Sequence, residues 1–338
     1  MKAAVIGAGA IGSVVTAYLT KKGKDVALIS REEQEAAINE FGGLKVNGVR
    51  GEERIKVEIL PRIDREFDLI IFAVKTQDIN AAVIENKEYF GNAMILSSQN
   101  GVQADFILNK HFPPQNVFSS IVMFGATYVR HGEVTFNFEG DWIVGKPFEP
   151  IDEKTQQIVD FLGAAFSVTK AENIMGMKWL KLFVNFNNCI PALIGKSMQE
   201  TFADIDMCRL SIMLLREGFE IIQKANIDLV SLPSFPAERI KGLAGMPMDQ
   251  AAGIINKTLT TLSEEPLYGS ILQSIMRKRA SEIDYINGEV VRVSKQIKEE
   301  APLNKRIVKM VHAVETKGIY FDVNEVKDAF SLRDAVQG

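Results

Sequence analysis

Residues 1–19, MKAAVIGAGAIGSVVTAYL, place three glycines between a short apolar run and a longer stretch of small and apolar residues. The run Ala3–Gly7 predicts a buried strand, and the residues after Gly12 predict a helix. In such a unit the first glycine allows a tight turn, the second lets the backbone approach a pyrophosphate, and the third packs helix against strand. The stretch therefore predicts a Rossmann-type dinucleotide-binding domain at the start of the sequence.

The same residues share one property with a secretory signal peptide, since Lys2 precedes an apolar stretch rich in small side chains. We reject that interpretation because the polar turn Lys21–Lys24 follows and leads into another apolar run, as in a folded strand-turn-helix unit. No other apolar run reaches the roughly 20 residues that are needed to cross a bilayer. We therefore expect a cytoplasmic protein without a membrane segment.

The composition indicates two globular domains and a small-molecule partner. The chain has 338 residues, of which 46% are hydrophobic, enough for two cores. Its formal net charge of −4 and the lack of a long basic block argue against nucleic acid as a partner. Cys189 and Cys208 are too few for a disulfide framework and show no metal-ligand spacing, so we expect a reducing compartment and no metal site.

Short apolar runs alternate with helical stretches through the first half of the chain, which predicts an α/β domain with a mainly parallel, doubly wound sheet. The predicted strands are Ala3–Gly7, Val26–Ile29, Ile55–Leu60, Leu69–Val74 and Ala93–Ser97. Glycine-broken segments over residues 117–145 predict antiparallel strands added at one edge. After about residue 172 the pattern is helical. We therefore expect a Rossmann-type domain over residues 1–170 and an all-helical domain over residues 171–338.

The glycine loop and the end of the second strand predict the cofactor. Free N–H groups and the helix dipole favour phosphate at the helix start, where the expected contacts are Gly7, Gly9, Ala10, Ile11 and Gly12. The second strand ends at Ser30 and Arg31, where an NAD-binding domain has an acidic residue for the ribose 2′-hydroxyl. A guanidinium can pair with a 2′-phosphate, so Arg31 favours NADP. The alternative is a solvated Arg31 beside Glu32 and Glu33.

Two further strand ends carry polar residues. Lys75 follows Ala73-Val74, and Asn100 follows Ser97-Ser98-Gln99. Ligands in such sheets lie outside the carboxyl ends of the strands, so we expect Lys75 and Asn100 to meet the nicotinamide end of the cofactor and the substrate. The alternatives are a solubilising lysine and an ordinary Asn-Gly turn. Gln99 receives no role.

Residues 178–189, KWLKLFVNFNNC, resemble the middle of a helix that carries lysines and asparagines through an apolar run. At about 100° per residue, four polar side chains fall within an arc of about 80°, namely Lys178, Lys181, Asn185 and Asn188. We expect this polar stripe to line a cleft between the domains; the alternative is that it meets only solvent or another helix. A lysine in a partly dry cleft has a lowered pKa and can donate the proton that ketone reduction needs.

Together these motifs resemble the ketopantoate reductase family. The resemblance is carried by GAGAIG at 7–12, VK at 74–75, QNG at 99–101, KLxxN at 181–185 and SEIDYING at 281–288. It implies reduction of a 2-keto acid to an (R)-2-hydroxy acid with NADPH. It also implies that Lys181 is the general acid and that Asn185 binds the substrate.

Two residues of the second domain complete the expected site. Ser270 begins Ser-Ile-Leu-Gln, which matches a capping box, so helix capping and substrate binding are both open to it. The resemblance favours substrate binding. Glu282 could pair with Lys181, hold its ammonium in line and bind a substrate hydroxyl, with an exposed helical glutamate as the alternative. Asp284 receives at most a structural role.

The sequence departs from the family at two places. Cys189 stands where the family has a second asparagine, and Asn188 supplies that amide only if the helix is distorted, which Pro191 favours because it lacks an N–H group. Ser274 and residues 278–281 replace the family's Asp-x-x-x-Gly-Arg. We expect these changes to alter the wall of the pocket and to leave the hydride and proton chemistry intact.

The favoured hypothesis is an NADPH-dependent reductase of ketopantoate, with Asn100, Asn185, Asn188 and Ser270 as substrate-binding residues. The alternatives are a reductase of another branched 2-keto acid, which Cys189 favours, a 3-hydroxyacid dehydrogenase, and an NADP-sensing protein without catalysis. The presence of Lys181 and Glu282 together argues against a sensing protein. The sequence leaves open the oligomeric state, a homodimer included, and whether residues 242–248 form a lid.

Overall fold

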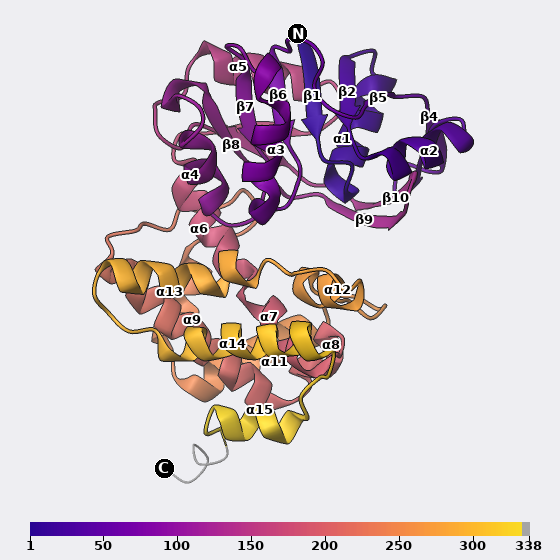
Figure 1. The fold of residues 1–338 in the computed structure, drawn as a ribbon. Helices are drawn as coiled ribbons and strands as arrows, with labels where there is room; N and C mark the ends of the chain where they lie inside the picture. Colours follow the sequence, from indigo (N-terminus) through magenta and orange to yellow (C-terminus); the bar gives the residue numbers. More distant parts are fainter. Residues whose placement is uncertain (333–338) are drawn as a thin grey trace. The chain divides into compact units, whose positions relative to one another are not determined.

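The computed structural model describes residues 1–332, and the chain divides into two compact units, Met1–Met175 and Gly176 onward. The first unit is an α/β domain and the second is helical, which confirms the fold class predicted from the sequence (Figure 1). The strands are β1 (Lys2–Ile6), β2 (Asp25–Ile29), β3 (Leu44–Gly48), β4 (Glu53–Ile55), β5 (Glu58–Leu60), β6 (Leu69–Phe72), β7 (Met94–Ser97), β8 (Val117–Val122), β9 (Gly125–Arg130), β10 (Glu133–Phe138), β11 (Trp142–Gly145) and β12 (Val168–Ala171).

The main sheet of the first unit has eight strands in the order β12-β11-β8-β7-β6-β1-β2-β5. β1 is central and pairs in parallel with β2 and β6, with Ile6 opposite both Ile29 and Phe72. The chain leaves β1 toward β2 and later returns to the other side of β1 through β6. Strand order therefore reverses beside β1, and in open α/β sheets ligands bind at that point, outside the carboxyl ends of the strands.

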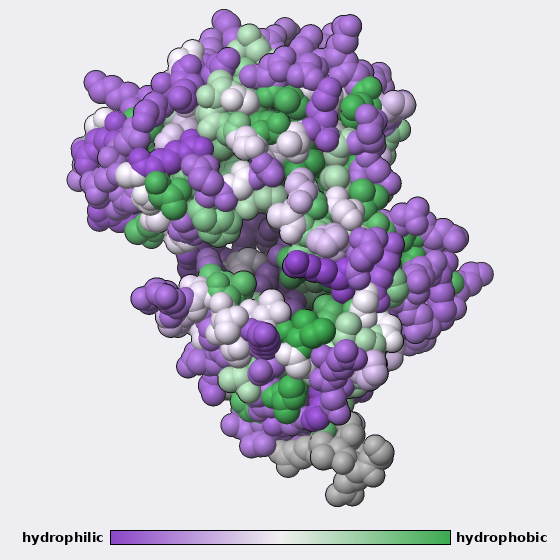
Figure 2. Space-filling model, turned by 180° about the vertical axis from the view of Figure 1, so that it is seen from behind, coloured by the Kyte–Doolittle hydropathy of each residue, from purple (hydrophilic) through white to green (hydrophobic). Residues whose placement is uncertain are grey.

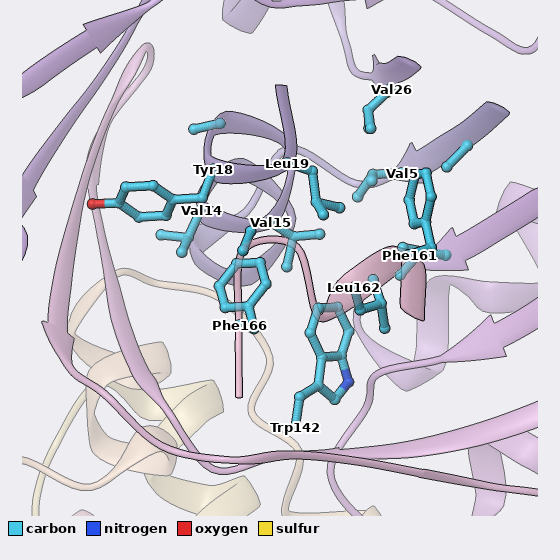
Figure 3. Close-up of a cluster of buried hydrophobic side chains, with 14 of the residues drawn as sticks. Val5, Val14, Val15, Tyr18, Leu19, Val26, Trp142, Phe161, Leu162 and Phe166 are labelled. Carbon is cyan, nitrogen blue, oxygen red and sulfur yellow. The ribbon is translucent and has the colours of Figure 1, made fainter. Parts of the chain in front are cut away.

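Helices cover both faces of this sheet because alternate side chains of each strand point to opposite faces. Ala3 and Val5 of β1 contact the layer that contains α1 (Ala10–Lys21) and α5 (Glu153–Leu162). Figure 3 shows part of this layer, in which side chains of α1 lie in one apolar cluster with Phe161, Phe166 and Trp142. Ala4 and Ile6 contact the opposite layer, which contains α3 (Ile79–Asn86) and α4 (Gln103–Asn109).

The prediction for residues 117–145 is only partly correct. β8 pairs in parallel with β7, and β11 pairs antiparallel with β8, one strand in from the edge strand β12. β9 and β10 instead join β3 and β4 in a separate four-stranded sheet, in the order β4-β3-β10-β9. In that sheet Lys45 of β3 lies opposite Glu133 of β10. Local periodicity predicts a strand but does not determine which distant strand it pairs with, so the second sheet was missed.

The remaining helices of the first unit are α2 (Glu32–Glu40) and the 3-10 turns η1 (Thr76–Asp78), η2 (Lys87–Tyr89) and η3 (Pro114–Asn116). The second unit follows from α6, which crosses the boundary between the units. Its elements are α6 (Ile174–Val184), η4 (Phe186–Asn188), α7 (Cys189–Ile194), α8 (Met198–Phe202), α9 (Ile205–Lys224), α10 (Glu238–Gly245), α11 (Met248–Thr260), α12 (Ser270–Met276), η5 (Ile283–Tyr285), α13 (Asn287–Gln296), α14 (Pro302–Lys317) and α15 (Val323–Ala329).

The long helix α9 organises the second unit, because α8, α10, α11, α13 and α14 all pack against it. Its residue Glu217 accepts hydrogen bonds from the backbone N–H groups of Leu303 at 2.8 Å and Asn304 at 2.7 Å. These N–H groups belong to the first turn of α14 and have no partner within the helix, so the carboxylate stabilises the start of that helix. The buried Asn304 side chain also accepts from Asn287 at 3.1 Å, which joins α9, α13 and α14.

Hydrophilic side chains cover most of the face seen in Figure 2, with hydrophobic residues exposed between them. Among residues 1–332, no helix has the length and apolar character needed to span a bilayer. Within the same residues, no group of three or more histidine, cysteine, aspartate or glutamate side chains is arranged to hold a metal ion.

Candidate active site

The glycine loop between β1 and α1 is held in a shape that only glycine allows at two of its positions. Gly7 has a φ of +113°, and a Cβ there would lie 2.7 Å from the backbone nitrogen of Val74. A Cβ at Gly12 would lie 1.9 Å from the carbonyl oxygen of Gly7. The loop therefore packs tightly against the end of β6, and α1 packs tightly against the loop.

Gly9 differs from Gly7 and Gly12, because a Cβ at this position would meet no atom of the protein within 4 Å. Gly9 is the N-cap of α1 and no side chain caps this helix. The N–H group of Ser13 bonds to the carbonyl oxygen of Gly9, so the N–H groups of Ala10, Ile11 and Gly12 come before the first bond of the helix. Open space above Gly9 and these donors fit a pyrophosphate.

The second strand ends where the sequence predicted a contact with the cofactor. Arg31 is exposed and is the N-cap of α2, and Ser30 before it is buried. Glu32 and Glu33 follow in the first turn of α2. The guanidinium thus lies at the carboxyl end of β2, next to the end of β1 that leads into the glycine loop.

Lys75 and Asn100 follow the neighbouring parallel strands β6 and β7, and both are half-buried. Gln99, to which the sequence gave no role, joins the two strand ends. Its side-chain Nε2 donates to the carbonyl oxygens of Phe72 and Val74, both at 2.8 Å. Since Gln99 is only 6% exposed, this bridge fixes the backbone before Lys75 relative to the backbone before Asn100. Its partners lie more than 20 residues away, so the sequence offered no signal for it.

In the second unit, Lys181 lies on α6 and is half-buried. Burial lowers its pKa to about 8, with a further contribution from the charge of Lys178, while the charge of Glu282 opposes the shift. Lys178 is one turn earlier on the same helix and is 2% exposed. The structure therefore brings Lys181 and Glu282 into electrostatic contact, and a pKa of about 8 suits a group that donates a proton near neutral pH.

The polar helix of residues 178–189 is broken, as the sequence suggested. α6 ends at Val184, a 3-10 turn covers Phe186–Asn188, and α7 begins at Cys189. The N–H group of Asn188 bonds to the carbonyl oxygen of Asn185 at 3.1 Å. Side chains three residues apart eclipse in a 3-10 turn, so Asn188 lies above Asn185 instead of being rotated away from it.

Asn188 also meets Ser270. Its Nδ2 donates to the Ser270 hydroxyl at 3.5 Å, and its side chain packs against Gly269, where a Cβ would lie 2.7 Å from the Asn188 Oδ1. Ser270 is the first residue of α12, Gly269 is the N-cap, and no side chain caps this helix. The capping role considered for Ser270 is therefore wrong, because its hydroxyl faces Asn188.

Cys189 does not take the place of the missing asparagine. Its side chain is 0% exposed, its Sγ donates to the carbonyl oxygen of Phe186 at 2.9 Å, and burial raises its pKa to about 12. The expectation that Cys189 alters the wall of the pocket stays a prediction; the structure shows that its thiol is fully buried. The 3-10 turn places Asn188, and not Cys189, beside Asn185.

Each unit carries its own set of candidate functional residues. The first is a dinucleotide-binding α/β domain with a glycine loop, and the second is a helical domain with a lysine of lowered pKa beside a glutamate and amide side chains. Family models described as ketopantoate reductase PanE/ApbA and ketopantoate reductase PanE/ApbA C terminal match residues 3–147 and 173–315.

Curated relatives match over nearly the whole chain. A 2-dehydropantoate 2-reductase of Pyrococcus abyssi is 30% identical over 308 residues, which cover 90% of this chain and 94% of the relative. A 2-dehydropantoate 2-reductase of Pyrococcus horikoshii is 29% identical over 323 residues, which cover 94% of this chain and 99% of the relative. The chain belongs to the ketopantoate reductase family.

Solved structures share the fold. The ternary structure of D-mandelate dehydrogenase with NADH and anilino(oxo)acetate matches with a TM-score of 0.80 at 21% identity and covers 94% of this chain and 99% of that one. The PanE/ApbA family ketopantoate reductase from Ralstonia eutropha JMP134 matches with a TM-score of 0.78 at 24% identity and the same coverage. At these identities the match shows a common fold.

Proposed function

We propose that this protein catalyses the NADPH-dependent reduction of a 2-keto acid, with ketopantoate as the favoured substrate and (R)-pantoate as the product. The observation that carries the proposal is the place of Lys181 on α6, where burial and the charge of Lys178 lower its pKa to about 8 against the charge of Glu282, and where the N–H group of Asn185 bonds to the Lys181 carbonyl oxygen. The relatives named 2-dehydropantoate 2-reductase support the choice of substrate.

The first unit binds the cofactor. The N–H groups at the start of α1 hold the pyrophosphate over Gly9, and Arg31 pairs with the ribose 2′-phosphate. Lys75 and Asn100 contact the nicotinamide end, and Gln99 keeps their two loops in register. When bound, the reduced nicotinamide supplies a hydride to C2 of the keto acid.

The second unit supplies the proton and substrate contacts. As the C–H bond forms at C2, the C=O π electrons move to the oxygen, which takes a proton from Nζ of Lys181. Glu282 keeps the ammonium directed at that oxygen and binds the new hydroxyl. The amides of Asn185 and Asn188 and the hydroxyl of Ser270 hold the substrate, and Asn100 is a further proposed substrate contact.

The direct test is Lys181→Ala. We expect kcat to fall roughly 10²–10⁴-fold with the NADPH Kd unchanged, because the variant loses proton donation and leaves the first unit intact. The wild-type kcat should fall as the pH rises above about 8, since only the protonated amine is an acid. Lys241→Ala, which removes an exposed lysine of α10, is the matched control and should keep wild-type kcat. Wild-type turnover in Lys181→Ala would exclude Lys181 as the acid.

A spectrophotometric screen identifies the substrate. NADPH oxidation is measured against ketopantoate, 2-ketoisovalerate and 3-keto acids, with NADH in parallel. We expect the highest kcat/KM for ketopantoate with NADPH. A preference for 2-ketoisovalerate or for a 3-keto acid would show that this acid, and not ketopantoate, is the substrate. No oxidation with any keto acid would favour a protein that only senses NADP.

A further inference from the structure

The segment that carries Glu282 is fastened to helix α14 on both sides of that residue. Before it, the backbone N–H of Ser281 donates to Glu315 Oε1 at 2.7 Å. After it, Asp284 Oδ1 lies 3.0 Å from Nε2 of His312. His312 and Glu315 are in turn joined, with 2.8 Å between Nδ1 and Oε2. One histidine and one glutamate of α14 therefore hold the chain on both sides of Glu282, at Ser281 and at Asp284.

This fastening matters because regular structure is sparse around Glu282. α12 ends at Met276 and α13 begins at Asn287, and between them the structure has only the 3-10 turn Ile283–Tyr285. Glu282 itself precedes that turn with φ −100° and ψ 25°. A short turn fixes a backbone less firmly than a long helix, so the contacts with α14 help to hold the backbone around Glu282.

The hydrogen bonds between this segment and α14 depend on the protonation state of His312. A neutral imidazole has one N–H group, whereas the imidazolium has two and can donate to both carboxylates at once. Asp284 and Glu315 are the charged groups that face the ring. Burial by itself lowers the pKa of His312, but the hydrogen bonds to Asp284 and Glu315 outweigh it and raise the pKa above its ordinary value.

The least exposed member of the cluster is Glu315, whose side chain is 15% exposed, against 43% for His312 and 56% for Asp284. Burial raises the pKa of Glu315, yet its hydrogen bonds with Ser281 and His312 outweigh burial and keep the pKa below its ordinary value. The carboxylate is thus ionised while it accepts from both partners, which favours a charged ring beside it.

We propose that His312 is a positioning residue, whose imidazolium binds Asp284 and Glu315 together and so holds Glu282 in place to orient Lys181. This inference rests on the proposed role of Glu282 in the reaction. Loss of a proton from His312 removes one of its two donors, and the segment that carries Glu282 is then tied to α14 less firmly. Turnover therefore depends on the charge of a residue that touches neither substrate nor cofactor.

The test compares wild type with His312→Gln over pH 6 to 9 in the full-length protein, using the keto acid that the wild type reduces best. Glutamine donates hydrogen bonds but carries no charge. At pH values below the pKa of His312, we expect kcat of the variant to be roughly three- to tenfold lower than that of wild type, in keeping with a half-exposed ion pair. The KM for NADPH should change little. The ratio of wild-type to variant kcat should approach one as the pH rises above that pKa.

A purely structural role gives a different result, because it lowers kcat by the same factor at every pH. A constant ratio, or a ratio of one throughout, overturns the proposal. His111→Gln removes an exposed histidine of the first unit that is hydrogen-bonded to Asn80, and it should match wild type at every pH.

A measurement without turnover provides the second check. NMR titration of the His312 ring should give a pKa above the ordinary value in wild type and a lower one in Asp284→Asn. An ordinary pKa in wild type overturns the proposal. Lys181→Ala distinguishes the two hypotheses: if it is inactive while the His312→Gln ratio is flat, only the role of His312 fails, whereas full activity of Lys181→Ala removes the proposed reaction itself.

Discussion

Cofactor preference can rest on a single residue. The sequence puts Arg31 at the end of β2, where the ribose of the cofactor is expected. We expect Arg31→Ala to weaken NADPH binding by roughly 10- to 100-fold, since a charge-assisted contact contributes about 1.5–3 kcal/mol. NADH, which lacks the 2′-phosphate, should lose little. Fluorescence titration with both cofactors measures the two Kd values, and Arg62→Ala, an exposed arginine elsewhere in the unit, is the control. Equal losses for NADPH and NADH would mean that the 2′-phosphate lies elsewhere.

Sequence reasoning works for residues whose signal is local. Lys181 and Asn185 stand out because four residues make one helical turn, and the structure puts Lys181 beside Glu282. Gln99 and His312 give no such signal, because the most distant partner of Gln99 lies 27 residues away and that of His312 lies 28 residues away. A glutamine or histidine becomes informative only when folding brings distant carbonyl or carboxylate oxygens to it.

At the scale of elements, the sequence predicted the strand-glycine-helix unit, and Pro191 favoured a distortion of the helix before it, because both depend on neighbours in the chain. It did not predict the second sheet, in which β3 pairs with β10 across nearly ninety residues. It also did not predict that Ser270 would begin α12 without capping it. Pairing partners and helix starts depend on tertiary packing, which local pattern does not contain.

The end of α12 offers a test at the same scale. Lys278 has a φ of +53°, and its N–H group bonds to Ile275 while that of Arg279 bonds to Ser274. These two bonds form a Schellman motif, whose left-handed position normally holds glycine. We expect Lys278→Gly to raise the free energy of unfolding by about 0.5–1 kcal/mol, because it removes the strain of a Cβ in that conformation.

Chemical denaturation measures this change, and a second lysine provides the control. Lys241 lies within α10, where backbone freedom is a cost, so Lys241→Gly should lower the free energy of unfolding by about 1 kcal/mol. A loss of stability in Lys278→Gly similar to that in Lys241→Gly would show that residue 278 is not held in the left-handed conformation.

At the scale of the whole molecule, the chain divides into two compact units, and the residues proposed for cofactor binding at the glycine loop and for proton donation belong to different units. The glycine loop belongs to the first unit, while Lys181, Glu282 and the His312 cluster belong to the second. Cofactor binding and proton donation should therefore respond to different substitutions. A ligand that binds only the folded state stabilises it by about 2.7 kcal/mol at a hundred times its Kd, so cofactor binding can be read from unfolding without any substrate.

We expect NADPH at a hundred times its Kd to raise the unfolding temperature of wild type and of Lys181→Ala by the same amount. Gly9→Ala should unfold like wild type without cofactor, because its Cβ meets no protein atom within 4 Å, yet it should lose most of the NADPH shift, because the methyl group occupies the space for the pyrophosphate. Gly12→Ala should be unstable even without cofactor, since its Cβ would lie 1.9 Å from the Gly7 oxygen. Calorimetry with and without NADPH separates the cases, and a full NADPH shift in Gly9→Ala would show that the pyrophosphate does not lie over this loop.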